Sequence, residues 1–528
     1  MRTLTLCVAL ALLALPAWAQ DATGTTAADP ADSSIQPPAP ELQRPEPASA
    51  TTLAPAPRAE DSAVLGVLGD DIGFTLDGHA KVGFIFIENF DLWPEGTGRG
   101  PNTINSVNSE VQLEPKLYIS EIAQIAATFD LLPDVYWGGD AQWTPVFQEG
   151  YVQFITVPGK FRLGRQWREF GAGLAYHRGD EDHSAFGFVP DPETEDRVEW
   201  DIRTRFGSVP LHLNLGMGWI DDPYANGIFS KSDRIRYALQ VGTHARDAFA
   251  IEGLLLFDNQ NSYQLQRFDA SIYTRWLMSR YVVGELEGGL RRGSSTGMYT
   301  LYDPLSRTTS TPEIEEHGYR GLLRVKLQHT RTKKGVYFDN TALSVVAANG
   351  PRRADQFRSN RLNQAGTAPA SCGCLIGGRY VLPQMRASYT ARQASDLAPA
   401  RAEARDSAAL AWSRTGDIDG LYIPSFLGSL GYKDFVTQLG FYFLGSVEPM
   451  DTRILKSNNG TVGASFDDYY QVGRTLGYEL DLSFRYTMLR HLEFGLDTGL
   501  FFGGSIPALA PAQNKPAYML LPRLTVTF

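Results

Sequence analysis

The chain has 528 residues, of which 43% are hydrophobic and 11% aromatic, and its formal net charge is -11. This negative charge argues against nucleic acid as a partner, because a protein that binds a polyanion presents a clustered basic surface. After the N-terminus there is no stretch of about 20 consecutive apolar residues, so the sequence excludes a helical membrane protein.

The N-terminal segment reads as a signal peptide. It has Arg2 as a short positive region, an apolar run from Leu4 to Leu15, and a small-residue cleavage site at Ala17-Trp18-Ala19. This order is typical of secretory signals. We therefore expect residues 1–19 to be removed after export and the mature chain to begin at Gln20.

The next segment, residues 20–60, is dominated by Ala, Pro, Thr and Ser. Such a segment buries too little apolar surface to offset its ordering entropy, which predicts a disordered periplasmic tether. A plain spacer is the simpler interpretation, and contact with a periplasmic partner is the alternative. In the mature chain only Cys372 and Cys374 remain, so disulfides do not staple the fold.

From Ile72 onward, segments of roughly ten residues alternate in polarity, which predicts β-strands. The clearest one places Val198, Trp200, Ile202, Thr204 and Phe206 on one face and Arg197, Glu199, Asp201, Arg203 and Arg205 on the other. The stretches 267–276 and 476–486 repeat this pattern. One such strand also fits a soluble β-sandwich, so the prediction rests on the recurrence.

The connections between these strands alternate between short and long. Tight turns are expected at 157–159, 207–208, 278–279 and 490–491, and long polar stretches near 91–106, 169–195, 220–233, 292–316, 348–405, 446–473 and 504–516. This asymmetry is typical of an all-β, up-and-down antiparallel transmembrane barrel, with short turns at the periplasmic rim. Residues 61–528 are predicted to form it, with about 18 strands within a range of about 16–20.

Two regions allow more than one interpretation, the first for the number of strands and the second for the shape of the pore. Between 348 and 430, the stretches 379–390 and 407–416 could supply one strand or several, and the periodicity at 394–411 suggests a short helix. In the connection 169–195, Gly171 and Gly173 would let the chain bend into the channel as a constriction.

The last segment, from Ala517, alternates in polarity and ends on Phe528. Tyr518, Leu520, Pro522, Leu524, Val526 and Phe528 share one face. A strand with one face in lipid and one in water has this pattern. It resembles the terminal strand of bacterial outer-membrane barrels, where a final Phe is an insertion signal, which implies outer-membrane lipid and the barrel-assembly machinery as partners.

A barrel of this size leaves an aqueous lumen, so the inward face decides the function. The candidate lumen or constriction residues are Arg162, Gln166, Arg168, Arg197, Arg203, Arg205, Arg267, Arg275 and Arg324. Either they pair with carboxylates and stiffen the wall, or unpaired arginines form a pathway for an anionic solute, because arginine holds carboxylates with two parallel hydrogen bonds. Arg165 breaks the alternation and predicts a bulge or a strand end.

The segment Arg162–Glu169, which reads RLGRQWRE, and the segment Leu476–Leu482, which reads LGYELDL, resemble strands of the alginate-export type of outer-membrane porin and of related large barrels of Gram-negative bacteria. The resemblance implies an eighteen-stranded barrel with an arginine-rich constriction that conducts an acidic polysaccharide. This lumen carries more acidic residues than that function would require.

The sequence thus predicts a porin-like channel in the outer membrane of a Gram-negative bacterium for small hydrophilic, anionic or saccharide solutes. It does not predict an enzyme, because the histidines lie singly and no nucleophile, base and orienting group can be assembled. No cofactor or metal is expected, since the residues His177, Asp180, Glu181, Asp182 and His183 read more simply as a solvated loop. A structural anchor with a loop-closed lumen is the alternative.

Overall fold

The computed structural model describes residues 63–67, 72–88, 103–120, 122–137, 146–157, 159–174, 176, 194–207, 209–220, 234–245, 248–261, 264–296, 301–303, 308–310, 313–327, 330–331, 335–338, 341–349, 361–362, 375–376, 420–446, 450–452, 470–472, 475–489, 491–503 and 516–528. The predicted signal peptide and the segment 20–60 lie outside these residues. No helix in the described parts of the chain is long and apolar enough to cross a membrane.

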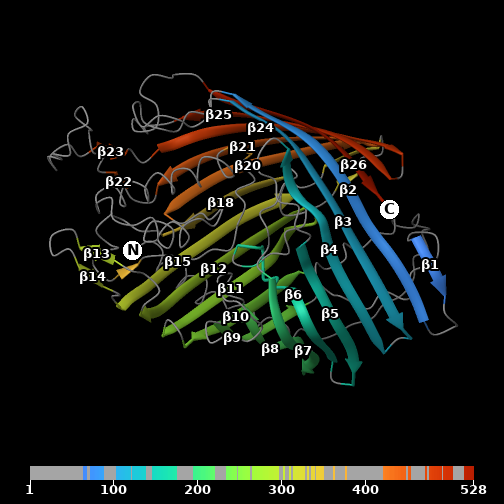
Figure 1. The fold of residues 1–528 in the computed structure, drawn as a ribbon, viewed down its shortest axis with the longest axis vertical. Helices are drawn as coiled ribbons and strands as arrows, with labels where there is room; N and C mark the ends of the chain where they lie inside the picture. Colours follow the sequence, from blue (N-terminus) through green and yellow to red (C-terminus); the bar gives the residue numbers. More distant parts are fainter. Residues whose placement is uncertain are drawn as a thin grey trace, which may run out of the picture. The chain divides into compact units, whose positions relative to one another are not determined.

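The described chain forms a closed antiparallel barrel of eighteen strands, as the sequence predicted (Figure 1). The eighteen are β2 (Ile72–Glu88), β3 (Thr103–Ile119), β4 (Ala123–Trp137), β5 (Val146–Thr156), β6 (Gly159–Trp167), β7 (Thr194–Phe206), β8 (Val209–Ile220), β9 (Arg234–Ala245), β10 (Phe249–Gln260), β11 (Leu265–Ser279), β12 (Val282–Thr296), β15 (Glu313–Leu327), β18 (Ala342–Ala348), β20 (Leu421–Tyr432), β21 (Phe435–Ser446), β24 (Thr475–Leu489), β25 (Leu492–Gly503) and β26 (Ala517–Thr527). Four shorter strands of the same sheet extend it: β1 (Ala63–Val67), β16 (Thr330–Arg331), β17 (Val336–Phe338) and β19 (Arg361–Leu362). Two separate hairpins complete the described strands: β13 (Leu301–Asp303) with β14 (Thr308–Ser310), and β22 (Met450–Thr452) with β23 (Tyr470–Val472).

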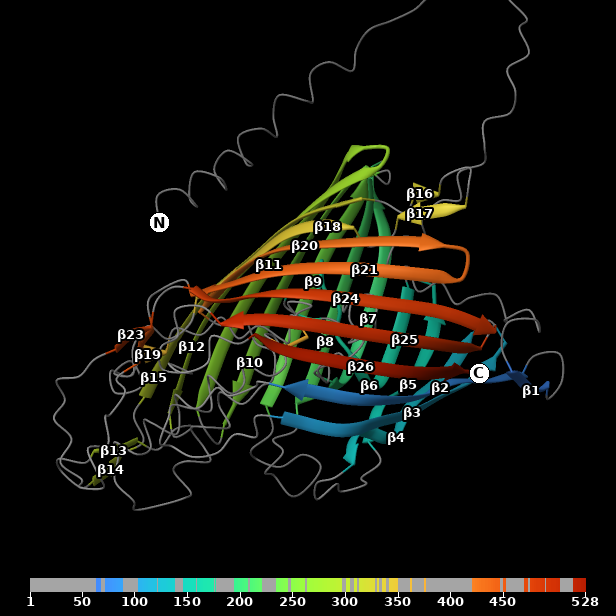
Figure 2. The same ribbon diagram turned by 90° about the horizontal axis from the view of Figure 1, so that it is seen from above.

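The barrel closes between its first and last long strands. β2 pairs antiparallel with β26 from His79 opposite Thr527 to Glu88 opposite Tyr518. Neighbours around the ring are otherwise consecutive long strands, as Figure 2 shows for β20, β21, β24, β25 and β26. Closure leaves no unpaired edge among the long strands, which a sheet in lipid requires because hydrocarbon offers no hydrogen bonds.

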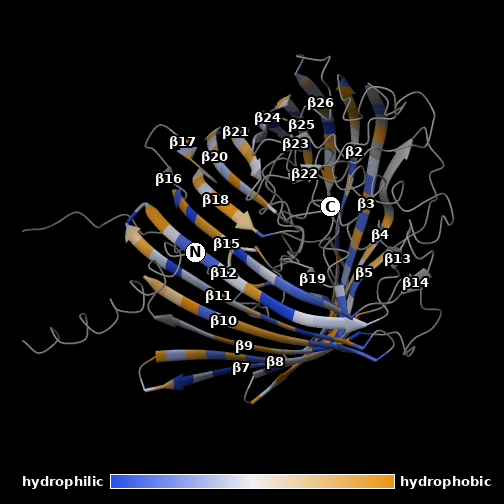
Figure 3. Ribbon diagram, turned by 90° about the vertical axis from the view of Figure 1, so that its left-hand side faces the viewer, coloured by the Kyte–Doolittle hydropathy of each residue, from blue (hydrophilic) through white to orange (hydrophobic). Residues whose placement is uncertain are grey.

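Hydrophilic and hydrophobic residues alternate along the strands (Figure 3), and the two faces of the wall have opposite polarity. On β7, Glu199 is 5% exposed whereas Trp200 on the other face is 38% exposed. On β26, Leu521 and Arg523 are buried while Leu520 and Leu524 are exposed. Charged side chains point inward and large apolar ones outward, the arrangement of a barrel whose outer face lies in lipid. The fold therefore supports the predicted outer-membrane localisation.

One rim of the barrel carries very short connections. β5 and β6, β7 and β8, β20 and β21, and β24 and β25 are each joined by two residues. β11 and β12 are joined by Arg280 and Tyr281, so the turn predicted at 278–279 lies two residues later, because β11 continues to Ser279. β2 starts and β26 ends at this rim, which is the periplasmic one in barrels of this kind.

Among the described residues, the uncertain region 348–430 contributes most of one long strand, β20, together with the last residue of β18 and the short strand β19. The stretches 379–390 and 407–416 and the helix expected at 394–411 lie outside the described residues. β18 and β20 pair directly, with Ala342 opposite Leu427, so the ring continues across this region without a further long strand between them.

Phe528 joins the two ends of the barrel. Its N–H donates to the carbonyl oxygen of Gly78, and its carbonyl oxygen accepts from the Gly78 N–H, both at 3.0 Å. Deleting Phe528 removes two main-chain hydrogen bonds, about 1–3 kcal/mol together, and should lower the fraction of assembled protein. Heat-modifiable migration of the outer-membrane fraction on a gel measures this. Deleting residues 21–55 is the control and should leave assembly unchanged; equal losses would contradict the insertion role.

Candidate functional site

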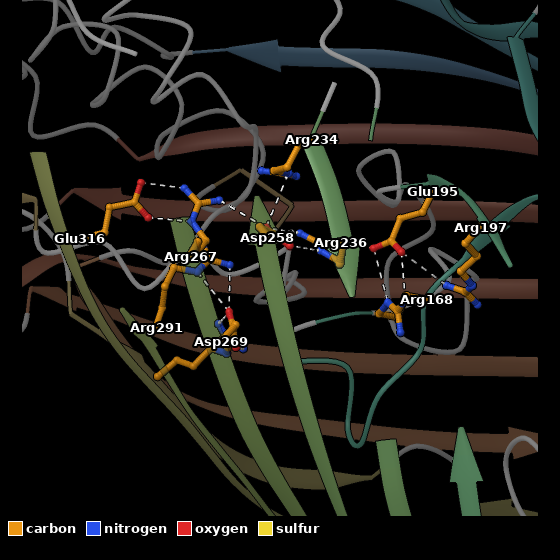
Figure 4. A network of polar contacts seen from close by, with 11 residues as sticks. Arg168, Glu195, Arg197, Arg234, Arg236, Asp258, Arg267, Asp269, Arg291 and Glu316 are labelled. Carbon is orange, nitrogen blue, oxygen red and sulfur yellow. Dashed lines mark hydrogen bonds and ion pairs between the residues drawn. The ribbon is translucent and has the colours of Figure 1, made fainter. Parts of the chain in front are cut away.

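A row of alternating arginines and carboxylates, here called the ion-pair chain, crosses the lumen wall from the end of β6 to β15 (Figure 4). Its members, in spatial order, are Arg168, Glu195, Arg236, Asp258, Arg267 and Glu316. Arg168 lies 2.9 Å from Glu195, and Arg236 donates from Nε and Nη2 to the two Asp258 oxygens at 2.7 and 3.0 Å. Arg236 also pairs with Glu195. Arg267 donates twice to Glu316, both at 2.7 Å.

The ion-pair chain passes over β8, which contributes no charged residue at this point. β8 turns Gly216 and Gly218 toward the lumen, opposite Glu199 and Arg197. A Cβ at Gly218 would lie 3.0 Å from Glu195 Oε2. Glycine therefore leaves the space through which Glu195 of β7 reaches Arg236 of β9.

A second group of charges lies beside this chain on β11, β12 and β15. Asp269 accepts from Arg320 Nη2 at 2.6 Å and pairs with Arg291 at 3.0 Å. Arg320 also donates to the hydroxyl of Ser271 at 2.7 Å. All four residues are at most 8% exposed. Two guanidinium groups share the Asp269 carboxylate in this buried position, and the close hydrogen bonds offset the cost of removing these charges from water.

The predicted lumen residues all face inward, but they separate into two sets. Gln166, Arg168, Arg197 and Arg267 are at most 8% exposed, and each of these arginines is paired with a carboxylate. Arg162 and Arg324 are partly exposed and lie near Glu199 at 3.8 Å and Glu285 at 2.5 Å. These arginines lie beside carboxylates, which is the first of the two arrangements that the sequence left open.

The other set comprises Arg203, Arg205 and Arg275. They form no ion pair within 4.0 Å with a carboxylate of the described residues, and Arg203 and Arg205 are exposed. All three lie on the lumen face within four residues of the short-turn end of their strands. Unpaired guanidinium groups are therefore confined to the periplasmic end of this wall in the part that the structure describes.

Summed over the described lumen faces, the two halves of the ring carry opposite charge. From β6 to β15 there are fourteen basic and nine acidic inward residues, and from β18 around to β5 four basic and nine acidic ones. The basic residues of the second half are Lys81, Lys116, Arg485 and Arg523. The lumen thus has a basic wall and an acidic wall, each with a surplus of five charges, which sets up a field across the pore.

After β6 the chain turns into the lumen at residues 170–176. Gly171 and Gly173 adopt positive φ angles of 58° and 83°, and Phe170 pairs with Tyr176 across the turn. Glu287 Oε2 on β12 accepts the N–H groups of Ala172 at 2.8 Å and Leu174 at 3.3 Å. Part of the connection 169–195 therefore does enter the lumen, at the glycines that the sequence marked.

The side chains of this turn are buried among the wall residues. Phe170, Leu174 and Tyr176 are at most 4% exposed, and the Arg236 guanidinium lies 5.6 Å from the centre of the Tyr176 ring. Burial raises the pKa of the Tyr176 hydroxyl, so this phenol stays neutral at physiological pH. The turn packs as an apolar element on the ion-pair chain.

A second segment enters from another connection. Leu375 and Ile376 are buried, and their N–H groups donate to Asp481 at 3.3 Å and Glu479 at 2.6 Å, both on β24. The adjacent Cys372 and Cys374 lie outside the described residues. In both insertions a wall carboxylate accepts backbone N–H groups.

Arg165 and Asp196 form a charged pair on the outward face. Arg165 donates to both Asp196 oxygens, at 2.8 and 2.9 Å. The sequence offered a bulge or a strand end here; β6 pairs with β7 without a bulge, and its pairing with β5 ends at Arg165. The expected strand end is close, since β6 ends at Trp167. The carboxylate on the neighbouring strand neutralises an arginine that would otherwise be costly beside lipid.

No group of three or more His, Cys, Asp or Glu side chains is placed to hold a metal ion within the described ranges. The acidic loop residues around His177 and His183 lie outside them. Sequence reasoning missed that Glu287, Glu479 and Asp481 hold inserted segments. The apolar alternation of Phe170, Leu174 and Tyr176 inside a long connection was the signal that could have found the first turn.

Comparison with protein-family models gives no match, and no curated protein matches the chain. Solved structures with similar folds include OccAB1 of Acinetobacter baumannii, at 9% identity and a TM-score of 0.47, covering 89% of this chain and 99% of that one. OpdK of Pseudomonas aeruginosa is 10% identical with a TM-score of 0.43, covering 88% and 100%. OmpT of Vibrio cholerae is 8% identical with a TM-score of 0.34, covering 88% and 100%.

Proposed function

We propose that the chain is a porin-like outer-membrane channel that passes hydrophilic solutes by diffusion. The observation that carries this proposal is the inverted polarity of a closed eighteen-strand barrel, with charged residues inside and exposed apolar residues outside. Eighteen strands enclose more space than inward side chains can fill, and the polar wall keeps that space wet.

The proposed solutes are anionic, and saccharides with carboxylate groups are the favoured class. Arg203, Arg205 and Arg275 support this preference, because an unpaired guanidinium attracts an anion whereas a buried ion pair does not. The acidic wall opposes it, so the preference depends on which wall the solute follows. Export of an acidic polysaccharide, as the alginate-export resemblance implies, is the narrower form of the same proposal.

A structural anchor with a closed lumen is the second candidate. The inserted segments at 170–176 and 375–376 favour it, since Leu174 and Ile376 are fully buried. Both candidates share the fold and the location in the membrane. They differ in whether water and ions cross the barrel.

Conductance in a planar lipid bilayer separates the two candidates. The purified protein should pass current in salt solution, and in a salt gradient the reversal potential should have the sign of an anion-preferring pore. Replacing Arg203 and Arg205 by glutamine should move that potential toward zero, because the local positive field is reduced. A silent protein would support the anchor, and cation preference would contradict the anionic solute.

A further inference from the structure

Three basic side chains meet at the periplasmic end of β6 and β7. Lys160 is the first lumen-facing residue of β6, and Arg203 and Arg205 are the last two of β7. β6 and β7 are hydrogen-bonded neighbours, with Lys160 opposite Asp201. The three cations therefore lie within one corner of the lumen, at the rim with the short turns.

The ammonium group of Lys160 has no hydrogen-bond partner among the described residues although its Nζ atom is buried. An ammonium group removed from water without an acceptor is unfavourable. The carboxylate across the strand, Asp201, lies 2.8 Å from Nε2 of His212 on the next strand. An oxyanion arriving from the rim would supply the acceptor that Lys160 lacks.

Arg203 and Arg205 extend this corner toward the rim. Successive lumen-facing residues of one strand are about 7 Å apart, so the two guanidinium groups can hold two anionic groups of one solute. Both are exposed, and Arg205 is one residue from the end of β7. Against these three cations Asp201 is the nearest described carboxylate on β7, which leaves a positive surplus of two.

We propose that Lys160, Arg203 and Arg205 form an anion-binding site, here called the rim site, for solutes with two or more carboxylate or phosphate groups. The inference rests on the proposed channel function and specifies the end of the pore at which anions are concentrated, namely the periplasmic mouth. Farther into the lumen, Arg168, Arg236 and Arg267 are already neutralised by carboxylates. A polyanion bound at the rim site would obstruct the pore from the periplasmic side.

The test compares how strongly an anion blocks the channel when it is added to one or the other side of a planar bilayer. A tag inserted between Lys433 and Asp434, in the two-residue connection of β20 and β21, marks the short-turn rim. Tripolyphosphate or a short oligogalacturonate is then added to one side. Block from the tagged side should need about tenfold less probe than block from the other side, and should weaken as salt rises.

The variant Lys160→Gln/Arg203→Gln/Arg205→Gln should remove this asymmetry of block. Lys116→Gln is the matched control, because Lys116 is a lumen-facing lysine near the same rim that is held by Asp77 at 3.1 Å. Equal block from both sides, or asymmetry that persists in the triple variant, would overturn the rim site. Stronger block by oligogalacturonate assigns carboxylates as the ligand, and stronger block by tripolyphosphate assigns phosphates.

A protein that conducts no current would count against the proposed function rather than the rim site. Calorimetric titration of tripolyphosphate into the micelle-bound protein tests the site independently of conduction. The wild-type chain and Lys116→Gln should bind, and the triple variant should lose at least about tenfold in affinity. Absence of binding by the wild-type chain would overturn the inference.

Discussion

Replacing Arg236 by alanine is expected to destabilise the barrel by roughly 3–5 kcal/mol, the cost of breaking a buried ion pair from one side. Arg236 is 2% exposed and is the link between Glu195 and Asp258. Its removal leaves both carboxylates buried with weaker compensation, and it removes the cation that lies over Tyr176. Urea-dependent unfolding of the protein reconstituted in lipid vesicles measures the loss.

Two further variants give this measurement its controls. Arg205→Ala removes an exposed arginine and should change stability by no more than about 0.5 kcal/mol. Arg236→Lys keeps the charge but not the two parallel hydrogen bonds to Asp258, so its loss should fall between the two. Similar stability of Arg236→Ala and Arg205→Ala would show that the ion-pair chain does not stabilise the barrel.

The sequence was sufficient for the barrel because a membrane strand repeats a simple rule. Polarity alternates with a period of two, so Trp200 and Glu199 could be assigned to lipid and lumen before any strand pairing was known. The same rule assigned Arg203 and Arg267 to the lumen. Counting the strands then required only the positions of the turns. Of the predicted tight turns, the one between β11 and β12 was misplaced by two residues.

The partners of the lumen residues could not be predicted in the same way. Arg267 and Glu316 are 49 residues apart, and Arg236 and Glu195 are 41 apart. Which charges meet depends on the register between neighbouring strands, and in the second pair on a strand that leaves a gap at Gly218. Assigning residues to the lumen face or the lipid face gives no information about strand register. It therefore grouped Arg168 with Arg203, although Arg168 is paired with a carboxylate and Arg203 is not.

The inserted turns were beyond sequence reasoning for a related reason. Glu287 lies 113 residues from Leu174, and no local pattern links a wall carboxylate to a distant backbone N–H. Gly171 and Gly173 indicated where the chain could bend, because positive φ angles are accessible to glycine. They did not indicate which wall the turn would reach.

Replacing Glu287 by alanine should release the turn at 170–176 and raise the conductance of each channel. The Glu287 carboxylate is fully buried and is the acceptor for the N–H groups of Ala172 and Leu174. Without it, each buried N–H costs about 1–3 kcal/mol until the turn moves to water. Single-channel recording in a planar bilayer measures the change, with the reversal potential recorded in the same experiment.

The controls for this variant separate release of the turn from loss of a lumen charge. Glu287→Gln keeps an oxygen that can accept both N–H groups, so its conductance should stay close to that of the unmodified chain. Glu493→Ala removes a lumen-facing carboxylate on β25 without touching the turn, and should shift the reversal potential without a rise in conductance. Gly171→Ala should act like Glu287→Ala, because an added Cβ would lie 2.8 Å from Glu287 Oε2 and from Tyr273 Cβ at a positive φ. Unchanged conductance in both Glu287→Ala and Gly171→Ala would mean that the turn does not limit the pore.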